Sequence, residues 1–159
     1  MLHRLLSAIA VITLLFLAAP EVHAQATLGG GMVYGSGVET AGLKLETTFP
    51  IARRFRGAGD LTFYLDDNDN AFDSYWAFNA NGHYILNSDG QADFYGLAGL
   101  NFTNYKYYGG NDTNTELGVN IGLGGQYHAN FGNLYGEVKY VASDLDQLVL
   151  GVGVRFPLR

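Results

Sequence analysis

The last segment of the chain alternates strictly between large apolar side chains and small or charged ones. Leu148, Leu150, Val152, Val154 and Phe156 share one parity, and a valine, two glycines and an arginine lie between them. Successive side chains of a β-strand point to opposite faces, so the pattern predicts a strand with one wholly apolar face. A chain built from many such segments is constrained to a sheet whose two faces meet different environments.

Seven earlier segments show the same alternation. Together with the closing segment they cover residues 26–34, 41–51, 58–65, 75–86, 92–103, 115–127, 134–142 and 148–156. The first of them is rich in glycine, and its sequence does not decide which parity faces which side. The 22 Gly, 11 Tyr and 10 Phe, with only 3 Pro, are also typical of an all-β chain.

The N-terminal residues have the features of a secretion signal. A short basic start precedes an apolar run from Leu5 to Ala19, and Val22-His23-Ala24 offers small residues where signal peptidase cleaves. The run is shorter than the roughly 20 residues that a helix needs to span a bilayer, which favours a signal peptide over an anchor. We therefore expect a signal peptide at residues 1–24 and one mature domain at residues 25–159.

The cysteine count and the net charge argue against a disulfide-stabilised protein and against a nucleic-acid-binding protein. The chain has no Cys, so no disulfide stabilises it after export. Its net charge of −6 argues against a nucleic-acid partner, because binding phosphate backbones requires clustered Lys and Arg.

Short alternating strands in an exported chain are typical of transmembrane barrels. Such a sheet must close, because an open edge in hydrocarbon would leave backbone groups without hydrogen bonds. We therefore expect an all-β, eight-stranded antiparallel up-and-down transmembrane barrel, preceded by a signal-peptide helix and with its aliphatic rows facing lipid. If both termini are periplasmic, outer loops fall at 35–40, 66–74, 104–114 and 143–147, and inner turns fall at 52–57, 87–91 and 129–133.

Aromatic residues gather near the ends of these segments, as membrane–water girdles do. The expected outer girdle comprises Tyr34, Tyr75, Trp76, Phe102, Tyr105, Tyr107, Tyr108 and Tyr140. The expected inner girdle comprises Phe49, Tyr84, Phe94, Tyr127, Phe131 and Phe156. The alternative is that aromatic residues simply favour strands.

The signal ending in Val22-His23-Ala24, the alternating segments and the closing Val152-Gly153-Val154-Arg155-Phe156 carry a resemblance. The chain resembles the small eight-stranded outer-membrane barrels of Gram-negative-type bacteria, the OmpX, OmpW and OmpA-barrel group. The resemblance implies a place in the bacterial outer membrane, with membrane lipid, lipopolysaccharide and the barrel-assembly machinery as partners. In that group the last strand usually ends in an aromatic residue that the machinery recognises, whereas three residues follow Phe156 here.

Seven charged residues fall on the inward parity of the expected strands. They are Lys44, Glu46, Asp60, Glu116, Glu137, Lys139 and Arg155. Side chains fill the lumen of an eight-stranded barrel, and a buried unpaired charge is costly, so we expect these acids and bases to pair. This favours a structural polar plug; the alternative is a narrow, gated ion path.

Neither the acidic loop nor the histidines make a convincing chemical site. The run from Asp66 to Asn70, with Asp73, matches a calcium loop poorly and is explained by the turn preferences of Asp and Asn. His83 and His128 lack a neighbouring Ser in the sequence with which to form a catalytic pair. We therefore expect no enzyme activity, no metal and no cofactor.

The expected function is structural or interactive. Loops 66–74 and 104–114 would meet an unknown surface partner, and the tyrosines between 105 and 108 would supply contact area. The main alternative is a narrow channel for ions or small hydrophobic solutes. A water-soluble barrel that encloses a lipid would require the opposite parity, with apolar residues inside and charges outside.

Overall fold

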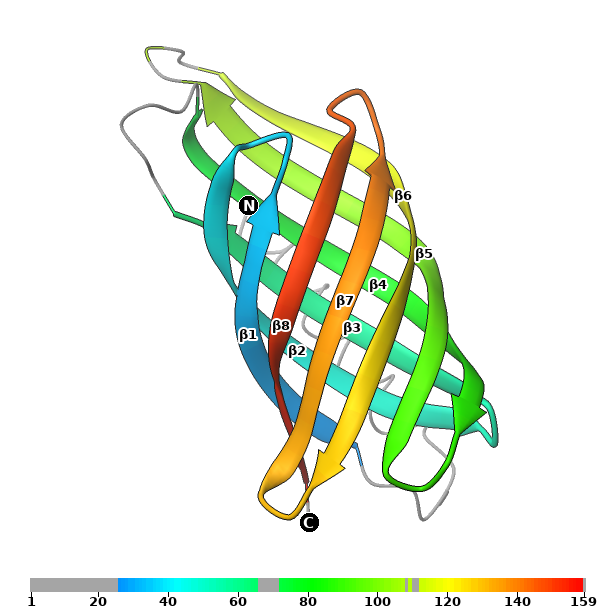
Figure 1. The fold of residues 1–159 in the computed structure, drawn as a ribbon. Coiled ribbons are helices and arrows are strands. Elements are labelled where there is room, and N and C mark those ends of the chain that lie inside the picture. Colours follow the sequence, from blue (N-terminus) through cyan, green and yellow to red (C-terminus); the bar gives the residue numbers. More distant parts are fainter. Residues whose placement is uncertain (1–25, 66–71, 108, 110–111, 159) are drawn as a thin grey trace, which may run out of the picture.

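The computed structural model describes residues 26–65, 72–107, 109 and 112–158, which form one closed antiparallel barrel (Figure 1). The strands are β1 (Thr27–Gly35), β2 (Thr40–Ala52), β3 (Phe55–Tyr64), β4 (Phe72–Ser88), β5 (Ala92–Tyr107), β6 (Thr113–Ala129), β7 (Gly132–Ala142) and β8 (Gln147–Pro157). Each strand pairs with its neighbours in the chain, and β8 pairs with β1 to close the ring. The predicted eight-stranded up-and-down barrel is confirmed. The expected signal peptide lies outside the described residues.

The described part of the chain holds no helix long and apolar enough to cross a bilayer.

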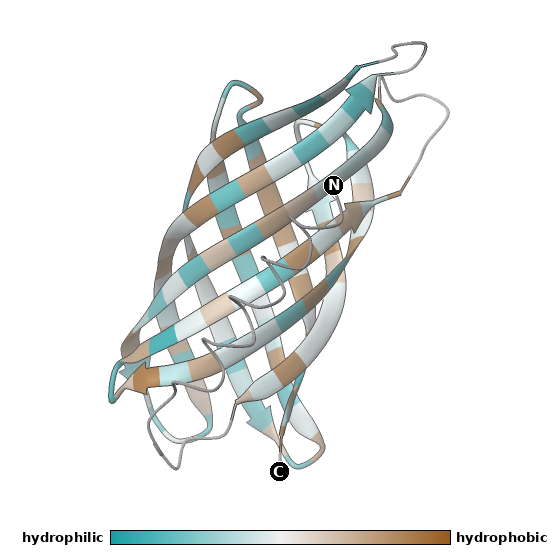
Figure 2. Cartoon of the chain, turned by 180° about the vertical axis from the view of Figure 1, so that it is seen from behind, coloured by the Kyte–Doolittle hydropathy of each residue, from teal (hydrophilic) through white to brown (hydrophobic). Residues whose placement is uncertain are grey.

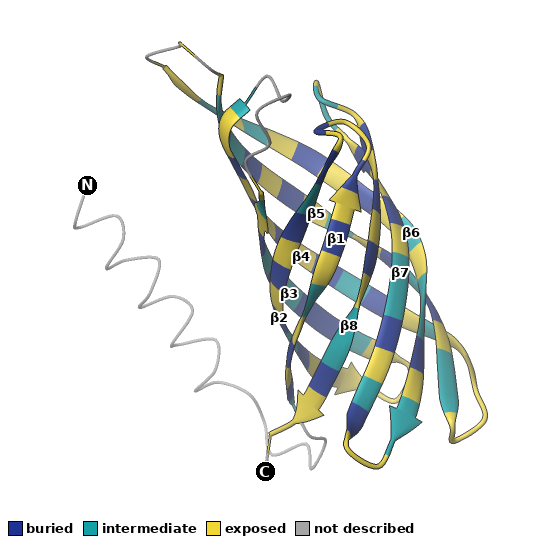
Figure 3. Ribbon diagram, turned by 60° about the vertical axis from the view of Figure 1, so that its left-hand side comes forward, coloured by how far each residue is buried: buried dark blue, intermediate teal, exposed yellow. Residues whose placement is uncertain are grey.

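Burial alternates along every strand, so the predicted parity is confirmed (Figure 3). Leu43, Leu45, Ile121, Leu123 and Leu150 belong to the exposed set, whereas the intervening residues face the lumen. Figure 2 shows the same alternation as hydropathy bands along the strands. Charges enclosed by an apolar outer wall exclude the water-soluble lipid-binding barrel, because that design needs the reverse arrangement. An exposed apolar surface this continuous is typical of a wall solvated by hydrocarbon.

The Gly-rich β1 has the parity that its sequence left open. Leu28 and Met32 point outward, whereas Val33 is buried inside. A Cβ atom built on Gly31 would lie 2.6 Å from the hydroxyl oxygen of Tyr135, and one built on Gly153 would lie equally close. These two glycines therefore make room for the Tyr135 side chain, which extends from β7 over β8 to β1.

The two ends of the barrel differ in their connections. At one end, here called the turn end, β1 begins, β8 ends and the short connections 53–54, 89–91 and 130–131 are found. The opposite end, the loop end, carries connections 36–39, 65–71, 108–112 and 143–146. The C-terminus lies at the turn end (Figure 1).

Strands β4, β5 and β6 are the longest, with 17, 16 and 17 residues. They extend past the predicted boundaries at the loop end, where Tyr107 pairs with Phe72 and Tyr105 pairs with Asn114. The predicted loop 104–114 is therefore wrong over most of its length. Tyr and Thr have high β-propensity, and pairing between three neighbouring strands continues through these polar residues.

Candidate functional site

Four of the seven predicted lumen charges form one compact network, which we call the ionic cluster: Lys44 and Glu46 on β2, Glu137 on β7 and Arg155 on β8. Arg155 is fully buried, and its guanidinium donates to both carboxylate oxygens of Glu46, at 2.9 and 3.2 Å. It also donates to Glu137 Oε1 at 2.6 Å, while Lys44 Nζ donates to Glu137 Oε2 at 2.8 Å. Two acids and two bases thus neutralise each other inside the lumen.

Uncharged side chains also interact with the ionic cluster. Tyr95 donates its hydroxyl to Glu137 at 2.8 Å, and Arg155 donates to the oxygens of Tyr95 and Gln126 at 3.1 and 2.8 Å. The Tyr135 ring lies 4.0 Å from the Arg155 guanidinium carbon, a cation–π distance. Tyr95 and Gln126 share the inward parity, but neither was among the predicted lumen residues because neither is charged.

Asp60 and Lys139 form a second, looser pair beside the ionic cluster. Their charged atoms are 3.9 Å apart, and Asp60 also accepts hydrogen bonds from Thr62 and Asn79 at 3.1 and 2.8 Å. Asn79 continues the network by accepting from Asn101 and Asn120, both at 2.9 Å. The inward parity of these amides was predictable, but the predicted lumen cluster comprised charged residues alone.

Glu116 lies apart from the other six predicted charges. Its Oε1 accepts a 2.6 Å hydrogen bond from the Tyr105 hydroxyl near the loop end. Parity placed Glu116 correctly on the inner face, but parity carries no information about height along the barrel axis.

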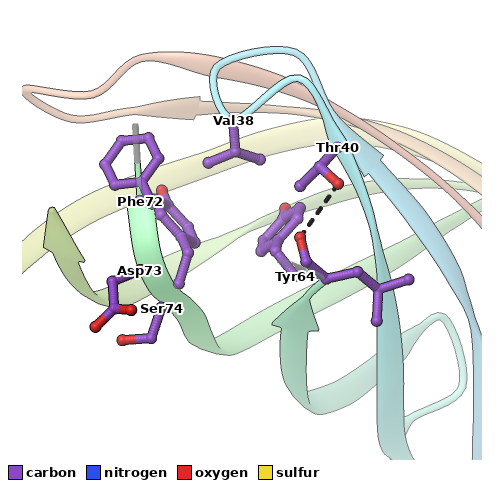
Figure 4. A pocket seen from close by; sticks show the side chains of 8 residues that line it. Val38, Thr40, Tyr64, Phe72, Asp73 and Ser74 are labelled. Carbon is purple, nitrogen blue, oxygen red and sulfur yellow. Dashed lines mark hydrogen bonds between the residues drawn. The ribbon is translucent and has the colours of Figure 1, made fainter. Parts of the chain in front are cut away.

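Aromatic and aliphatic side chains close the lumen at the loop end. We call this group the aromatic cap; it comprises Val38, Tyr64, Phe72, Tyr75, Tyr105 and Leu145. Tyr75 contacts both Tyr64 and Phe72 edge to face, with ring centroids 5.1 and 5.2 Å apart. A cavity of about 20 Å³ beside the cap, lined also by Thr40, Leu65, Asp73 and Ser74, has room for about one water molecule (Figure 4).

The aromatic cap corrects part of the predicted outer girdle. Tyr75 and Tyr105 are each only 6% exposed and face the lumen, so neither belongs to a girdle. Tyr34, Trp76, Phe102, Tyr107 and Tyr140 are exposed as predicted, and Tyr108 lies outside the described residues. All six residues of the predicted inner girdle are exposed.

Replacing Tyr105 with phenylalanine tests the cap. Tyr105→Phe removes the donor to Glu116 and leaves a half-buried carboxylate with one partner fewer, so we expect the free energy of unfolding to fall by about 1.5–3 kcal/mol. Tyr107→Phe alters an exposed ring two residues away and should change that free energy by less than about 0.5 kcal/mol. Urea titration in phospholipid vesicles measures both variants, and equal values would contradict an inward Tyr105.

The histidines occupy two different environments. His83 is buried in the lumen and stacks on Tyr95, with ring centroids 4.6 Å apart. At the turn end, His128 Nε2 lies 3.1 Å from Asp93 Oδ2. The other oxygen of the same carboxylate, Oδ1, accepts a 2.6 Å hydrogen bond from the Ser88 hydroxyl. The structure thus brings a Ser and a His close to one carboxylate, which sequence separation had concealed. The carboxylate stands between them, however, and a nucleophile requires direct contact with its base.

Only the edge of the acidic loop lies within the described residues. Residues 66–71 lie outside the described part, while Asp73 forms a 3.1 Å ion pair with Lys106. Among the residues that the structure describes, no group of three or more His, Cys, Asp or Glu side chains is arranged to hold a metal ion.

Comparison with known proteins identifies the fold. Neither a protein-family model nor a curated protein matches the sequence. Among solved structures, the N-terminal β-barrel domain of Pseudomonas aeruginosa OprF matches with a TM-score of 0.68 and 14% identity, over 85% of this chain and 99% of that one. Neisserial surface protein A matches with a TM-score of 0.59 and 19% identity, over 85% of this chain and 96% of that one.

The attachment invasion locus protein Ail of Yersinia pestis is a further match, with a TM-score of 0.51 and 17% identity over 84% of this chain and 99% of Ail. Ail has also been solved with the heparin analogue sucrose octasulfate and in a phospholipid bilayer nanodisc. This chain therefore has the fold of small eight-stranded outer-membrane barrels, and the predicted resemblance is confirmed at the level of fold.

Proposed function

We propose that this protein is a non-enzymatic, non-conducting barrel of the bacterial outer membrane, with a structural or surface-interaction role. The observation that carries the proposal is a lumen filled with side chains behind a continuous apolar outer wall. The ionic cluster occupies one level of the lumen and the aromatic cap another. Lumen side chains that are held by ion pairs and ring contacts are more typical of a rigid structural barrel than of a channel for solutes.

Membrane lipid is the partner that the outer wall supports most directly. Aliphatic side chains such as Leu45, Ile121 and Val152 are more than half exposed and would contact acyl chains. Lipopolysaccharide and the barrel-assembly machinery follow from the resemblance as further partners. The turn end would face the periplasm, since it carries the C-terminus and the shorter connections.

Charge at the loop end limits the kind of surface partner. Its exposed carboxylates in the described residues are Glu39, Asp73, Asp112, Asp144 and Asp146. Lys106, which pairs with Asp73, lies among them. An acidic rim repels sulfated glycans, so the heparin analogue found with Ail is a poor model for this chain, and a cationic or neutral partner fits better.

Conductance in planar bilayers tests the proposal against the channel alternative. We expect the folded protein to insert without producing single-channel current steps, because charged and aromatic side chains occupy the lumen at two heights. Heat-modifiable migration of the same sample on a gel, after purification from the outer-membrane fraction, establishes that the inserted protein is a closed barrel. Regular current steps from such a sample would favour a narrow channel instead.

A further inference from the structure

Two arginines form the tip of the β2–β3 connection at the turn end. Ala52 pairs with Phe55, so Arg53 and Arg54 are the two residues of the turn itself, and both are exposed. Within the described part of the chain neither side chain lies within 4.0 Å of a carboxylate. The third arginine of this segment, Arg56, points inward instead, where its guanidinium lies over the Tyr95 ring.

The described carboxylates at the turn end already have partners in the chain. Asp89 accepts hydrogen bonds from the backbone N–H groups of Gln91 and Ala92, at 2.9 and 2.8 Å. Asp93 accepts from Ser88 and lies 3.9 Å from Arg56. The exposed positive charge of the turn is therefore available to an external anion, in contrast to the acidic loop end.

Apolar side chains surround the turn on the outer wall. Phe49, Ile51 and Phe55 are each more than 40% exposed, and the Phe55 ring contacts Tyr84 edge to face at 6.2 Å. The guanidinium groups thus lie where the apolar wall ends and water begins, which is the level of lipid headgroups. A guanidinium binds phosphate oxygens with two parallel hydrogen bonds and keeps its charge at every physiological pH.

We propose that the Arg53–Arg54 turn binds the phosphate of an anionic phospholipid, whose acyl chains lie along Phe49, Ile51 and Phe55. The inference rests on the proposed membrane location and adds a headgroup preference to it. Two guanidinium groups against one phosphate leave positive charge uncompensated, so a headgroup without an ammonium, such as phosphatidylglycerol, is preferred over phosphatidylcholine.

Spin-label electron paramagnetic resonance measures this preference directly. The full barrel is reconstituted in phosphatidylcholine bilayers with a trace of spin-labelled phosphatidylglycerol or phosphatidylcholine, and the motionally restricted fraction of each label is compared. We expect the wild type to retain phosphatidylglycerol roughly two- to fivefold more strongly than phosphatidylcholine at low salt. The preference should fall in 1 M salt because exposed charges are then screened.

Matched variants assign the preference to the turn. R53Q/R54Q should abolish it, and R53K/R54K should retain part of it, since lysine keeps the charge but loses the planar fork. K106Q removes a cation from the opposite end and should leave the preference unchanged. The proposal is overturned if the wild type shows no preference, if R53Q/R54Q keeps it, or if K106Q loses as much of it as R53Q/R54Q. Absence of any restricted fraction for both labels would instead contradict the membrane location itself.

Discussion

Replacing Arg155 with methionine lowers the free energy of unfolding by about 3–5 kcal/mol, the cost of leaving buried partner charges uncompensated. Arg155 is fully enclosed and donates to Glu46 and Glu137 through three hydrogen bonds between 2.6 and 3.2 Å. Methionine keeps most of the unbranched apolar stem of arginine, so most of the loss is electrostatic. Urea titration in phospholipid vesicles gives the value, with the fluorescence of the single tryptophan, Trp76, as the signal.

A compensated variant separates charge from packing. In R155M/E46Q the carboxylate that faces Arg155 most fully is neutral, and Lys44 still balances Glu137 through their 2.8 Å contact. We expect this double variant to recover much of the lost stability, because removing a whole buried pair costs far less than breaking it. If R155M unfolds at the same urea concentration as the wild type, the cluster is hydrated and the lumen is not a packed plug.

Parity was the part of this structure that the sequence could predict. Alternation in residues 148–156 placed Arg155 inside and its apolar neighbours outside, and the same rule sorted Lys44 and Glu46 correctly. It works because side-chain direction in a strand depends only on residue number, whatever the partner strand. The closed eight-stranded ring followed from the count and the need to pair every edge.

Contacts inside the lumen could not be predicted in this way. Glu46 and Arg155 meet across β1, where both residues are in register with Gly29. That meeting depends on the stagger of all eight strands, which no single segment encodes. Glu116 shows the consequence: it has the correct parity but lies at a different height and binds Tyr105 instead of a base.

The inward orientation of Tyr75 and Tyr105 could have been predicted from the sequence. Tyr75 has the same parity as the buried Asn79, and Tyr105 has the same parity as the buried Asn101. Tyr75 begins the predicted strand 75–86, but it was assigned to the girdle by its residue type, and the predicted strand 92–103 ended before Tyr105. Applying the period-2 rule to Tyr75 and extending it past 103 would have turned both tyrosines inward.

Substituting arginine at the middle of β6 distinguishes a lipid-facing wall from a wall in water. Ile121 is 63% exposed and lies midway along β6, so Ile121→Arg would place a charge near the centre of the hydrocarbon layer and cost about 2–4 kcal/mol. In water the same change at an exposed site would stay within about 0.5 kcal/mol.

Phe131 is a matched control, because it is 64% exposed but lies in the β6–β7 connection at the turn end, where Phe131→Arg should cost about 0–1 kcal/mol. Urea titration of both variants in vesicles compares two equally exposed side chains that differ in depth. Equal, small losses at the two positions would mean that the wall does not meet hydrocarbon, whereas a large loss at Ile121 alone assigns it to the bilayer.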